Sequence, residues 1–160
     1  MQPMKSILFV CLGNICRSPM AEYIFKDLVA KAGLSDQFEI ASAATSDEEH
    51  GNPVYPPAKR KLHEHGISCE GHAAHQITFS EYKHYDYIVA MEPRNLQRLK
   101  PIIGDDPDGK VSLLLDHTPT TDTKHHNRGI ADPWYTGNFD EAYEDILIGC
   151  KALLEELKES

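Results

Sequence analysis

The stretch Ser6-Ile-Leu-Phe-Val-Cys-Leu-Gly-Asn-Ile-Cys-Arg-Ser-Pro19 joins an apolar run to the start of a helix. Residues 6–10 show no polar alternation, which is typical of a strand covered on both faces in a parallel sheet. Ser18 is a residue type that caps helices, Pro19 suits a first helical position, and Gly33 offers a left-handed stop. The stretch therefore predicts a strand, a loop and a helix that ends near Gly33.

The rest of the chain continues this alternation. Strands are predicted at 38–43, 86–91 and 110–115, and helices at 57–66, 93–99 and 139–157, the last with Asn138 and Glu141 spaced like a capping box. Strands that alternate with helices predict an α/β sandwich with a mostly parallel sheet. Ligands of such folds bind beyond the carboxyl ends of the strands, so the loop 11–18 is the first place to expect a site.

Length and charge narrow the function classes. The 160 residues, without repeat or linker, predict a single domain over residues 1–160. No window approaches the roughly 18 consecutive apolar residues of a membrane span, and no signal peptide is recognisable, so we expect a cytoplasmic protein with reduced cysteines. Sixteen Lys and Arg against 25 Asp and Glu give a net charge of −9. This charge disfavours binding to nucleic acid or to an anionic membrane.

The loop after the first predicted strand combines a cysteine with an anion site. Gly13 and Asn14 tolerate positive φ, so the arc from Cys11 can turn its backbone N–H groups inward, and Arg17 can clamp a phosphate or arsenate oxyanion. These dipoles and charges favour the thiolate of Cys11, and Ser18 can donate a hydroxyl proton to the sulfur. The plainer alternative is a buried small cysteine, a surface arginine and an ordinary helix cap.

Two segments carry a family resemblance. Val10-Cys-Leu-Gly-Asn-Ile-Cys-Arg-Ser-Pro-Met-Ala-Glu22 closely resembles the active-site segment of the low-molecular-weight protein tyrosine phosphatases, and Asp132-Pro-Trp-Tyr135 is similar to their acid loop. The resemblance extends to residues 42–44, 66–67, 72 and 91–96. It implies a three-layer α/β sandwich with a four-stranded parallel sheet, the flavodoxin-like architecture. It also implies hydrolysis of phosphotyrosine and aryl phosphate monoesters through a cysteinyl-phosphate, with no cofactor and no metal.

The resemblance assigns the catalytic roles. Cys11 is expected to be the nucleophile and Arg17 the transition-state clamp. Asp132 is expected to protonate the leaving oxygen and then to activate the hydrolytic water. Pro133 restricts the backbone of Asp132 toward an extended shape. Without the resemblance, Asp132-Pro133 would be read as an ordinary turn.

The remaining site residues surround these three. Leu12 and Ile15 are expected to line the mouth, and Trp134 and Tyr135 to form apolar walls against an aromatic ring. Related protein-arginine phosphatases carry threonine where this chain has Ile15, which favours phosphotyrosine. The substrate-binding set is completed by residues of the same arc: Gly13, Asn14, Cys16 and Ser18.

Two further expectations concern support and regulation. Asn14, Ser42 and His72 resemble a family network of hydrogen bonds that holds the loop, although His72 is equally well read as a surface polar residue. Cys16 resembles the family cysteine that forms a reversible disulfide with the nucleophile, which would protect Cys11 from over-oxidation. Its alternative role is simple loop packing.

Two positions depart from the family pattern. Glu48 aligns with a position where family members often carry a large aromatic wall, and Tyr55 is a candidate replacement ring. A carboxylate at 48 should repel acidic phosphopeptides and favour basic ones. Position 75 is histidine where the family has arginine. These departures concern substrate preference.

Parts of the sequence are also compatible with other functions. A thiol-dependent arsenate reductase can use the same cradle, but it needs resolving cysteines near the third strand, where only Cys69 is found. A phosphopeptide-binding module would need neither Cys11 nor Asp132. The nine histidines do not fall into metal-ligand spacings. The expected partners are a phosphotyrosine-containing protein and inorganic phosphate as product, with a monomer or a weak dimer as the assembly.

Overall fold

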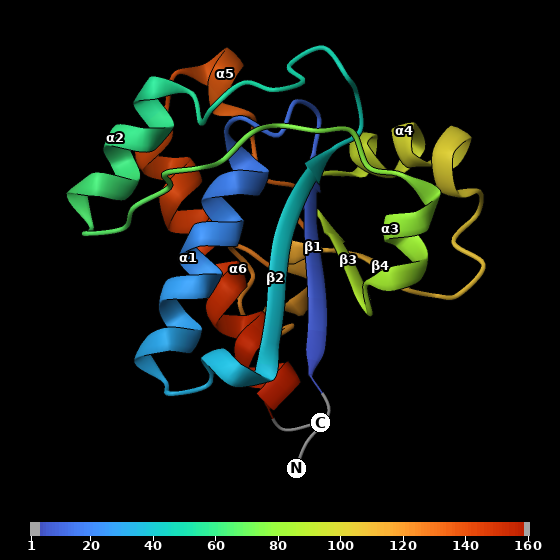
Figure 1. Ribbon diagram of the computed structural model, residues 1–160. Helices are drawn as coiled ribbons and strands as arrows, with labels where there is room; N and C mark the ends of the chain where they lie inside the picture. The colour runs from blue at the N-terminus through green and yellow to red at the C-terminus, as the bar shows by residue number, and fades with distance from the viewer. Residues whose placement is uncertain (1–3, 159–160) are drawn as a thin grey trace.

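A four-stranded parallel sheet forms the centre of the computed structural model, which describes residues 4–158 (Figure 1). The strands are β1 (Lys5–Cys11), β2 (Phe38–Ala44), β3 (Tyr87–Ala90) and β4 (Val111–Leu113), in the order β2-β1-β3-β4. All four predicted strands are confirmed. The last is shorter than predicted, because a 3-10 helix, η2 (Leu114–His117), follows β4 directly.

Helices cover both faces of this sheet. One face carries α1 (Arg17–Lys31), α2 (Pro56–Glu64) and α6 (Phe139–Lys158), and the other carries α3 (Phe79–His84) and α4 (Pro93–Ile103) (Figure 1). The 3-10 helix η1 (Ser35–Gln37) precedes β2, and the short helix α5 (Pro133–Thr136) lies above the carboxyl ends of the strands. The expected three-layer α/β sandwich is therefore confirmed. Within residues 4–158 no helix has the length and apolar character to cross a membrane.

The unbroken apolar run at residues 7–10 of β1 follows from these layers. Ile7 and Phe9 belong to the core under α1 and α6, whereas Leu8 and Val10 belong to the core under α3 and α4. Successive side chains of a strand point to opposite faces. Because both faces of β1 are covered, all four side chains are buried, and no polar residue interrupts the run.

Several helix predictions need correction. Helix α1 begins at Arg17 with Cys16 at the N-cap position, so Ser18 lies inside the first turn and is not the cap. Helix α4 continues past residue 99 to Ile103. Neither α3 nor the four-residue α5 is among the sequence predictions, although Thr78 and Glu81 form a full capping box at the N-terminus of α3. These differences lie at helix ends and in two short helices.

Two other predicted helix ends agree with the structure, whereas α2 ends at Glu64, short of the predicted residue 66. Gly33 has φ 72° after α1, which is the predicted left-handed stop. At the start of α6, Asn138 Oδ1 accepts a hydrogen bond from the Glu141 N–H at 3.0 Å. The Glu141 carboxylate accepts from the Asn138 side-chain amide at 3.1 Å. The capping pair predicted at this position is thus present, with a side-chain to side-chain return bond.

The strand order determines where a site can form. Strand β1 lies between β2 and β3, so the chain crosses the sheet in one direction from β1 to β2 and in the other direction to β3 and β4. A crevice opens where the direction reverses, at the carboxyl end of the central strand. The residues that follow Cys11, the last residue of β1, lie at this position (Figure 1).

Candidate active site

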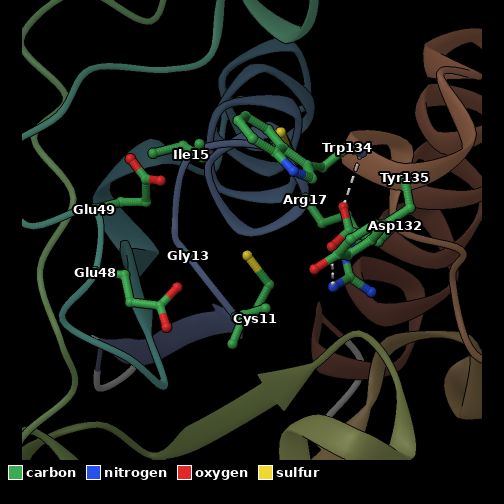
Figure 2. A pocket seen from close by; sticks show the side chains of 11 residues that line it. Cys11, Gly13, Ile15, Arg17, Glu48, Glu49, Asp132, Trp134 and Tyr135 are labelled. Atoms are coloured by element: carbon green, nitrogen blue, oxygen red, sulfur yellow. Dashed lines mark hydrogen bonds and ion pairs between the residues drawn. The ribbon is translucent and has the colours of Figure 1, made fainter.

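A cavity of about 150 Å³ lies directly over Cys11 (Figure 2). Its walls come from three segments: the loop after β1, the loop after β2 and the start of α5. The lining residues are Cys11, Leu12, Gly13, Ile15, Cys16, Arg17, Glu48, Glu49, Asp132, Trp134 and Tyr135. The structure therefore brings the two predicted sequence segments together at one place, although more than one hundred residues separate them.

The loop after β1 adopts the strained shape expected of an anion cradle. Asn14 has φ 59°, in the left-handed region that asparagine tolerates. Gly13, the other residue expected there, does not have positive φ. Helix α1 begins at Arg17 immediately after the loop, so its free N–H groups point toward the cavity side of the turn. Backbone donors and the Arg17 guanidinium thus surround one position in the cavity over Cys11.

Ser18 contacts the sulfur of Cys11 twice. The backbone N–H of Ser18 donates to Cys11 Sγ at 3.3 Å, and the Ser18 hydroxyl lies 3.1 Å from the same sulfur. Ser18 is fully buried and does not line the cavity. Its predicted function as a helix cap is wrong, but its predicted contact with the sulfur is confirmed.

Asn14 is the centre of a hydrogen-bond network behind the loop. Its Nδ2 donates to Ser18 Oγ at 2.7 Å and to Ser42 Oγ at 2.9 Å, and its Oδ1 accepts from the His75 backbone N–H at 3.3 Å. The His72 ring contacts the Asn14 carbonyl at 2.7 Å. Asn14 is fully buried and lies outside the cavity lining. These contacts hold the positive φ in place and point to a supporting position for Asn14 rather than a ligand contact.

Arg17 is buried under the cavity, with 2% of its side chain exposed. Its Nη1 donates to the Ile130 carbonyl at 2.8 Å and pairs with Glu92, and its Nη2 lies 3.3 Å from Asp132 Oδ2. Burial by itself lowers the pKa of Arg17, but the charges of Cys11, Asp132 and Glu92 outweigh this and raise the pKa above its ordinary value. A permanently charged guanidinium is therefore fixed beside the sulfur.

Asp132 caps the short helix α5. Its Oδ1 accepts from the Trp134 backbone N–H at 3.0 Å, while Pro133 occupies the first helical position. The backbone of Asp132 is extended, with φ −80° and ψ 112°, as predicted from the following proline. The cap leaves Oδ2 directed at Arg17 and at the cavity (Figure 2). A local turn thus sets the position of this carboxylate.

Aromatic and acidic side chains form opposite sides of the mouth. Trp134 and Tyr135 are 50% and 76% exposed on the Asp132 side, and Glu48 and Glu49 lie across the cavity from them (Figure 2). Tyr55 does not line the cavity; its ring lies 4.6 Å from the Trp134 ring, centroid to centroid. Tyr55 therefore supports the aromatic wall from behind and does not replace the missing ring itself.

Comparison with known proteins agrees with this geometry. Residues 6–160 match the family model described as "Low molecular weight phosphotyrosine protein phosphatase". The chain belongs to this family. It is 40% identical over 155 residues to the low molecular weight protein-tyrosine-phosphatase YfkJ of Bacillus subtilis, with 97% of each chain covered, and 41% identical over 155 residues to the rat phosphatase, with 94% of each covered.

Solved structures give the same result. The crystal structure of YfkJ superposes with a TM-score of 0.92 at 39% identity, over 99% of this chain and 97% of the other. A Drosophila arginine phosphatase superposes with a TM-score of 0.83 at 31% identity, over 97% and 98%. The low molecular weight phosphatase fold is thus shared by proteins named for different phosphorylated residues, and the substrate has to be argued from the site.

The second cysteine of this low molecular weight phosphatase differs from Cys11 in its surroundings. Cys16 is 5% exposed and packs with Ile15 and Ala74. Burial, together with the neighbouring Cys11, raises the pKa of Cys16 well above its ordinary value. Cys16 is therefore a neutral thiol at physiological pH. Neither cysteine is in a disulfide in the structure.

Several site residues were not predicted from the sequence. Glu22 accepts from Ser42 Oγ at 2.6 Å and so ends the network that begins at Asn14. Glu92 pairs with Arg17, and Glu49 lines the cavity beside Glu48. Glu22 and Glu92 lie inside the segments that carried the family resemblance, which is the signal that points to them. For Glu49 the sequence offers only its position next to Glu48.

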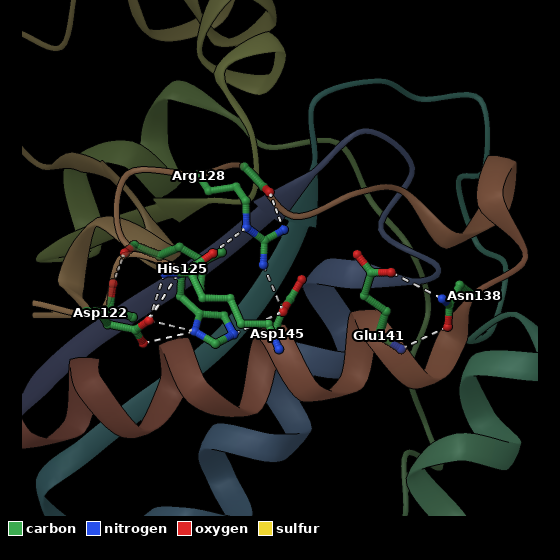
Figure 3. A network of polar contacts seen from close by, with 10 residues as sticks. Asp122, His125, Arg128, Asn138, Glu141 and Asp145 are labelled. Atoms are coloured by element: carbon green, nitrogen blue, oxygen red, sulfur yellow. Dashed lines mark hydrogen bonds and ion pairs between the residues drawn. The ribbon is translucent and has the colours of Figure 1, made fainter. Parts of the chain in front are cut away.

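A polar network ties the segment before Asp132 to helix α6 (Figure 3). Asp145 of α6 is 3.0 Å from Arg128 Nη2 and 3.6 Å from His125 Nε2, and His125 Nδ1 lies 2.9 Å from Asp122 Oδ2. The Asp145 side chain is 4% exposed. Because a carboxylate as buried as Asp145 is costly to leave without its partners, the network fixes the path of the chain toward Asp132.

Two other histidines make polar contacts of this kind. His75 pairs with Glu81 at 2.8 Å, and His117 with Glu156 at 2.9 Å. In the part of the chain that the structure describes, no group of three or more His, Cys, Asp or Glu side chains is arranged to hold a metal ion.

Proposed function

We propose that this chain is a protein tyrosine phosphatase that hydrolyses phosphotyrosine and aryl phosphate monoesters through a cysteinyl-phosphate. One observation carries the proposal: Cys11, Arg17 and Asp132 all line the same cavity. They supply a nucleophile, a clamp for an oxyanion and a proton donor, which are the three groups that this reaction needs. The family membership supports the same assignment.

In the first step the Cys11 thiolate attacks phosphorus. An S–P bond forms, the P–O bond to the aryl group breaks, and Asp132 gives its proton to the leaving oxygen. The Ser18 N–H and hydroxyl, both within 3.3 Å of the sulfur, stabilise the thiolate before attack and when it leaves again.

In the second step water replaces the sulfur. Asp132, now a carboxylate, takes a proton from water as the oxygen attacks phosphorus, and the S–P bond breaks to release inorganic phosphate and the thiolate. Throughout both steps Arg17 donates to the phosphoryl oxygens from a buried, fixed position. Cys16 remains a neutral thiol and does not compete as nucleophile, because its pKa is raised by burial.

The walls of the cavity favour an aromatic phosphate ester. Trp134 and Tyr135 offer exposed rings on one side, and Ile15 offers an apolar surface on the other. Phosphoarginine is the second candidate substrate, supported by the fold shared with an arginine phosphatase. Ile15, where related arginine phosphatases carry threonine, favours phosphotyrosine. Glu48 at the mouth disfavours acidic groups on its side of the substrate.

Further expectations complete this proposal. Residues 1–160 act as one phosphatase domain, as a monomer or weak dimer, on a phosphotyrosine-containing protein. The location is cytoplasmic, because a nucleophilic thiolate needs a reducing compartment. Under peroxide, Cys11 and Cys16 form a reversible disulfide that stops catalysis and prevents over-oxidation.

The test is turnover of para-nitrophenyl phosphate and of a phosphotyrosine peptide. Cys11→Ser should lose turnover together with the cysteinyl-phosphate. Asp132→Ala should lose about 10²–10⁴-fold in rate on poor leaving groups and less on activated ones. Cys69→Ala and Asp105→Ala, at positions outside the cavity, are the matched controls and should keep full activity. Unchanged rates in either active-site variant would reject the proposal.

Three further measurements distinguish the proposed activity from the alternatives. An arsenate reductase would reduce arsenate robustly with a thiol reductant, whereas the proposal expects negligible turnover. A binding module would bind the phosphopeptide but release no phosphate from wild type. A higher kcat/KM for phosphoarginine than for phosphotyrosine would show that phosphoarginine, and not phosphotyrosine, is the preferred substrate.

A further inference from the structure

A second pocket adjoins the Cys11 cavity on the Asp132 side. Its volume is about 240 Å³. It shares four lining residues with the Cys11 cavity: Leu12, Arg17, Asp132 and Tyr135. Because the two pockets have a common wall, a substrate whose phosphate lies over Cys11 can place a neighbouring side chain in the second pocket.

The outer wall of this pocket carries two arginines, Arg94 and Arg98. Arg94 and Arg98 are both exposed and lie one turn apart on α4, so they share one face of the helix. Among residues 4–158 neither guanidinium makes a hydrogen bond or an ion pair. Arg17, in the same pocket, is already engaged by Glu92 and Asp132. Arg94 and Arg98 are therefore the cations that remain available to a ligand.

The charge of this pocket contrasts with the rest of the molecule. Its lining holds three arginines against the carboxylates of Glu92 and Asp132, in a chain whose net charge is −9. Glu48 and Glu49 line the Cys11 cavity but not the second pocket, and they lie across the cavity from Asp132 (Figure 2). The mouth of the site is thus acidic on one side and basic on the other.

We propose that the pocket at Arg94 and Arg98 is a specificity subsite for an anionic side chain, a carboxylate or a second phosphate, adjacent to the phosphotyrosine of a protein substrate. This inference rests on the proposed phosphatase function. Arginine suits the role because its planar fork pairs with carboxylate and phosphate oxygens. The acidic wall at Glu48 and Glu49 repels the same group on the opposite flank. Substrates are therefore selected, and oriented, by an anion on one side of the phosphotyrosine only.

The test uses phosphotyrosine peptides that differ only in the flanking residue. One has alanine on both sides, one has glutamate before the phosphotyrosine, one has glutamate after it, and two carry phosphoserine at those same positions. Wild type should favour an anion on one flank over the alanine peptide by about fivefold to tenfold in kcat/KM at low salt, and the preference should shrink as salt is added. The larger gain, with glutamate or with phosphoserine, identifies the source of the anion.

Two double variants distinguish an effect of this subsite on substrate preference from a general effect of positive charge. Arg94→Gln/Arg98→Gln should reduce the preference to about onefold. Lys59→Gln/Arg60→Gln removes two exposed cations from α2, on the other face of the sheet, and should retain the preference. A preference that survives Arg94→Gln/Arg98→Gln, or is equal on both flanks, would overturn the inference. So would the absence of any preference in wild type that still hydrolyses the alanine peptide. Failure to hydrolyse para-nitrophenyl phosphate and every peptide would instead reject the phosphatase function.

Discussion

Arg17 and Asp132, which are 115 residues apart in the sequence, meet at 3.3 Å between Nη2 and Oδ2 beside the sulfur of Cys11. The clamp and the proton donor of the proposed reaction are therefore also an ion pair. A phosphoryl group over Cys11 needs the same guanidinium, so the Asp132 carboxylate and the bound anion compete for it and repel each other. The residue that makes turnover possible weakens the binding of phosphate.

This competition predicts opposite effects of Asp132→Asn on binding and on turnover. The variant keeps the side-chain shape and the cap to Trp134 but removes the negative charge. We expect inorganic phosphate to bind about tenfold more tightly, the equivalent of about 1.4 kcal/mol, while turnover is largely lost. Calorimetric titration of wild type and variant with phosphate measures this. Asp105→Asn, on the exposed α4–β4 connection, is the control; equal or weaker binding by Asp132→Asn contradicts the expected repulsion.

The conformation of Asn14 allows backbone strain to be separated from hydrogen bonding. Asn14→Ala loses three side-chain hydrogen bonds and places an alanine at φ 59°, whereas Asn14→Gly loses the same bonds without that strain. We expect both variants to lose stability and kcat, and Asn14→Ala to be less stable than Asn14→Gly by about 1 kcal/mol. Urea unfolding measures the difference. Equal stability of the two variants would show that the left-handed conformation carries no cost here.

Local features of the sequence are sufficient to predict much of the fold. The strand at β1, the left-handed Asn14 and the stop at Gly33 each depend on a few neighbouring residues, and all three were predicted. The start of α1 was misplaced because Ser18 is a good cap by type. In the folded chain its hydroxyl is used by Cys11 and Asn14, and Cys16 takes the cap position without a side-chain hydrogen bond.

Long-range contacts were beyond local reasoning. The Glu92 carboxylate meets Arg17 across 75 residues, and no periodicity or spacing predicts such a contact. Asp132 was found only through the resemblance of its loop to a known family. Arg94 and Arg98 read as ordinary exposed residues of a helix until the fold places that helix next to the cavity. Local sequence patterns thus predict the groups that lie on one loop, whereas of the groups that tertiary structure brings to it, the family resemblance points to Asp132 and no local pattern points to Arg94 or Arg98.

The His75–Glu81 pair predicts a specific pH dependence of stability. The hydrogen bond to Glu81 raises the pKa of His75 above its ordinary value of 6.5. Burial alone would raise the pKa of Glu81, but the bond and charge of His75 lower it below its ordinary value of 4.5. The His75 contribution is complete below about pH 6.5 and is lost as pH rises through its folded-state pKa. The Glu81 contribution is complete above about pH 4.5 and is lost as pH falls through its own. The pair therefore stabilises most between about pH 4.5 and 6.5.

The free energy of unfolding of Glu81→Gln, compared with that of wild type, checks this pH range. The variant should be less stable by up to about 1 kcal/mol near about pH 5.5, and the difference should diminish near about pH 8.5. Glu64→Gln is the matched control, because Glu64 pairs with Lys61, whose charge does not change in this range. A loss in Glu81→Gln that is the same at both pH values would contradict the sign argued from His75.

The close approach of α6 to η2 predicts that a favourable helix substitution will destabilise the protein. A Cβ added at Gly149 would lie 2.5 Å from Leu114 Cγ, and Leu114 is fully buried. Alanine in place of helical glycine normally gains about 0.5–1 kcal/mol, but overpacking costs about 1–3 kcal/mol. We therefore expect Gly149→Ala to lower the free energy of unfolding by about 1–2 kcal/mol, while Lys151→Ala on the exposed face of α6 stays near neutral.

Measuring Gly149→Ala in a second background, Leu114→Ala, tests directly whether contact with Leu114 causes the loss of stability. Leu114→Ala removes the three atoms that the new methyl group would meet, so its own cost is a cavity next to Gly149. In that background Gly149→Ala fills part of the cavity and keeps its gain in helix propensity, and it should become stabilising. Urea unfolding of the four proteins of this cycle measures the coupling. If Gly149→Ala destabilises equally in both backgrounds, the loss does not come from contact with Leu114, and the glycine is required for another reason.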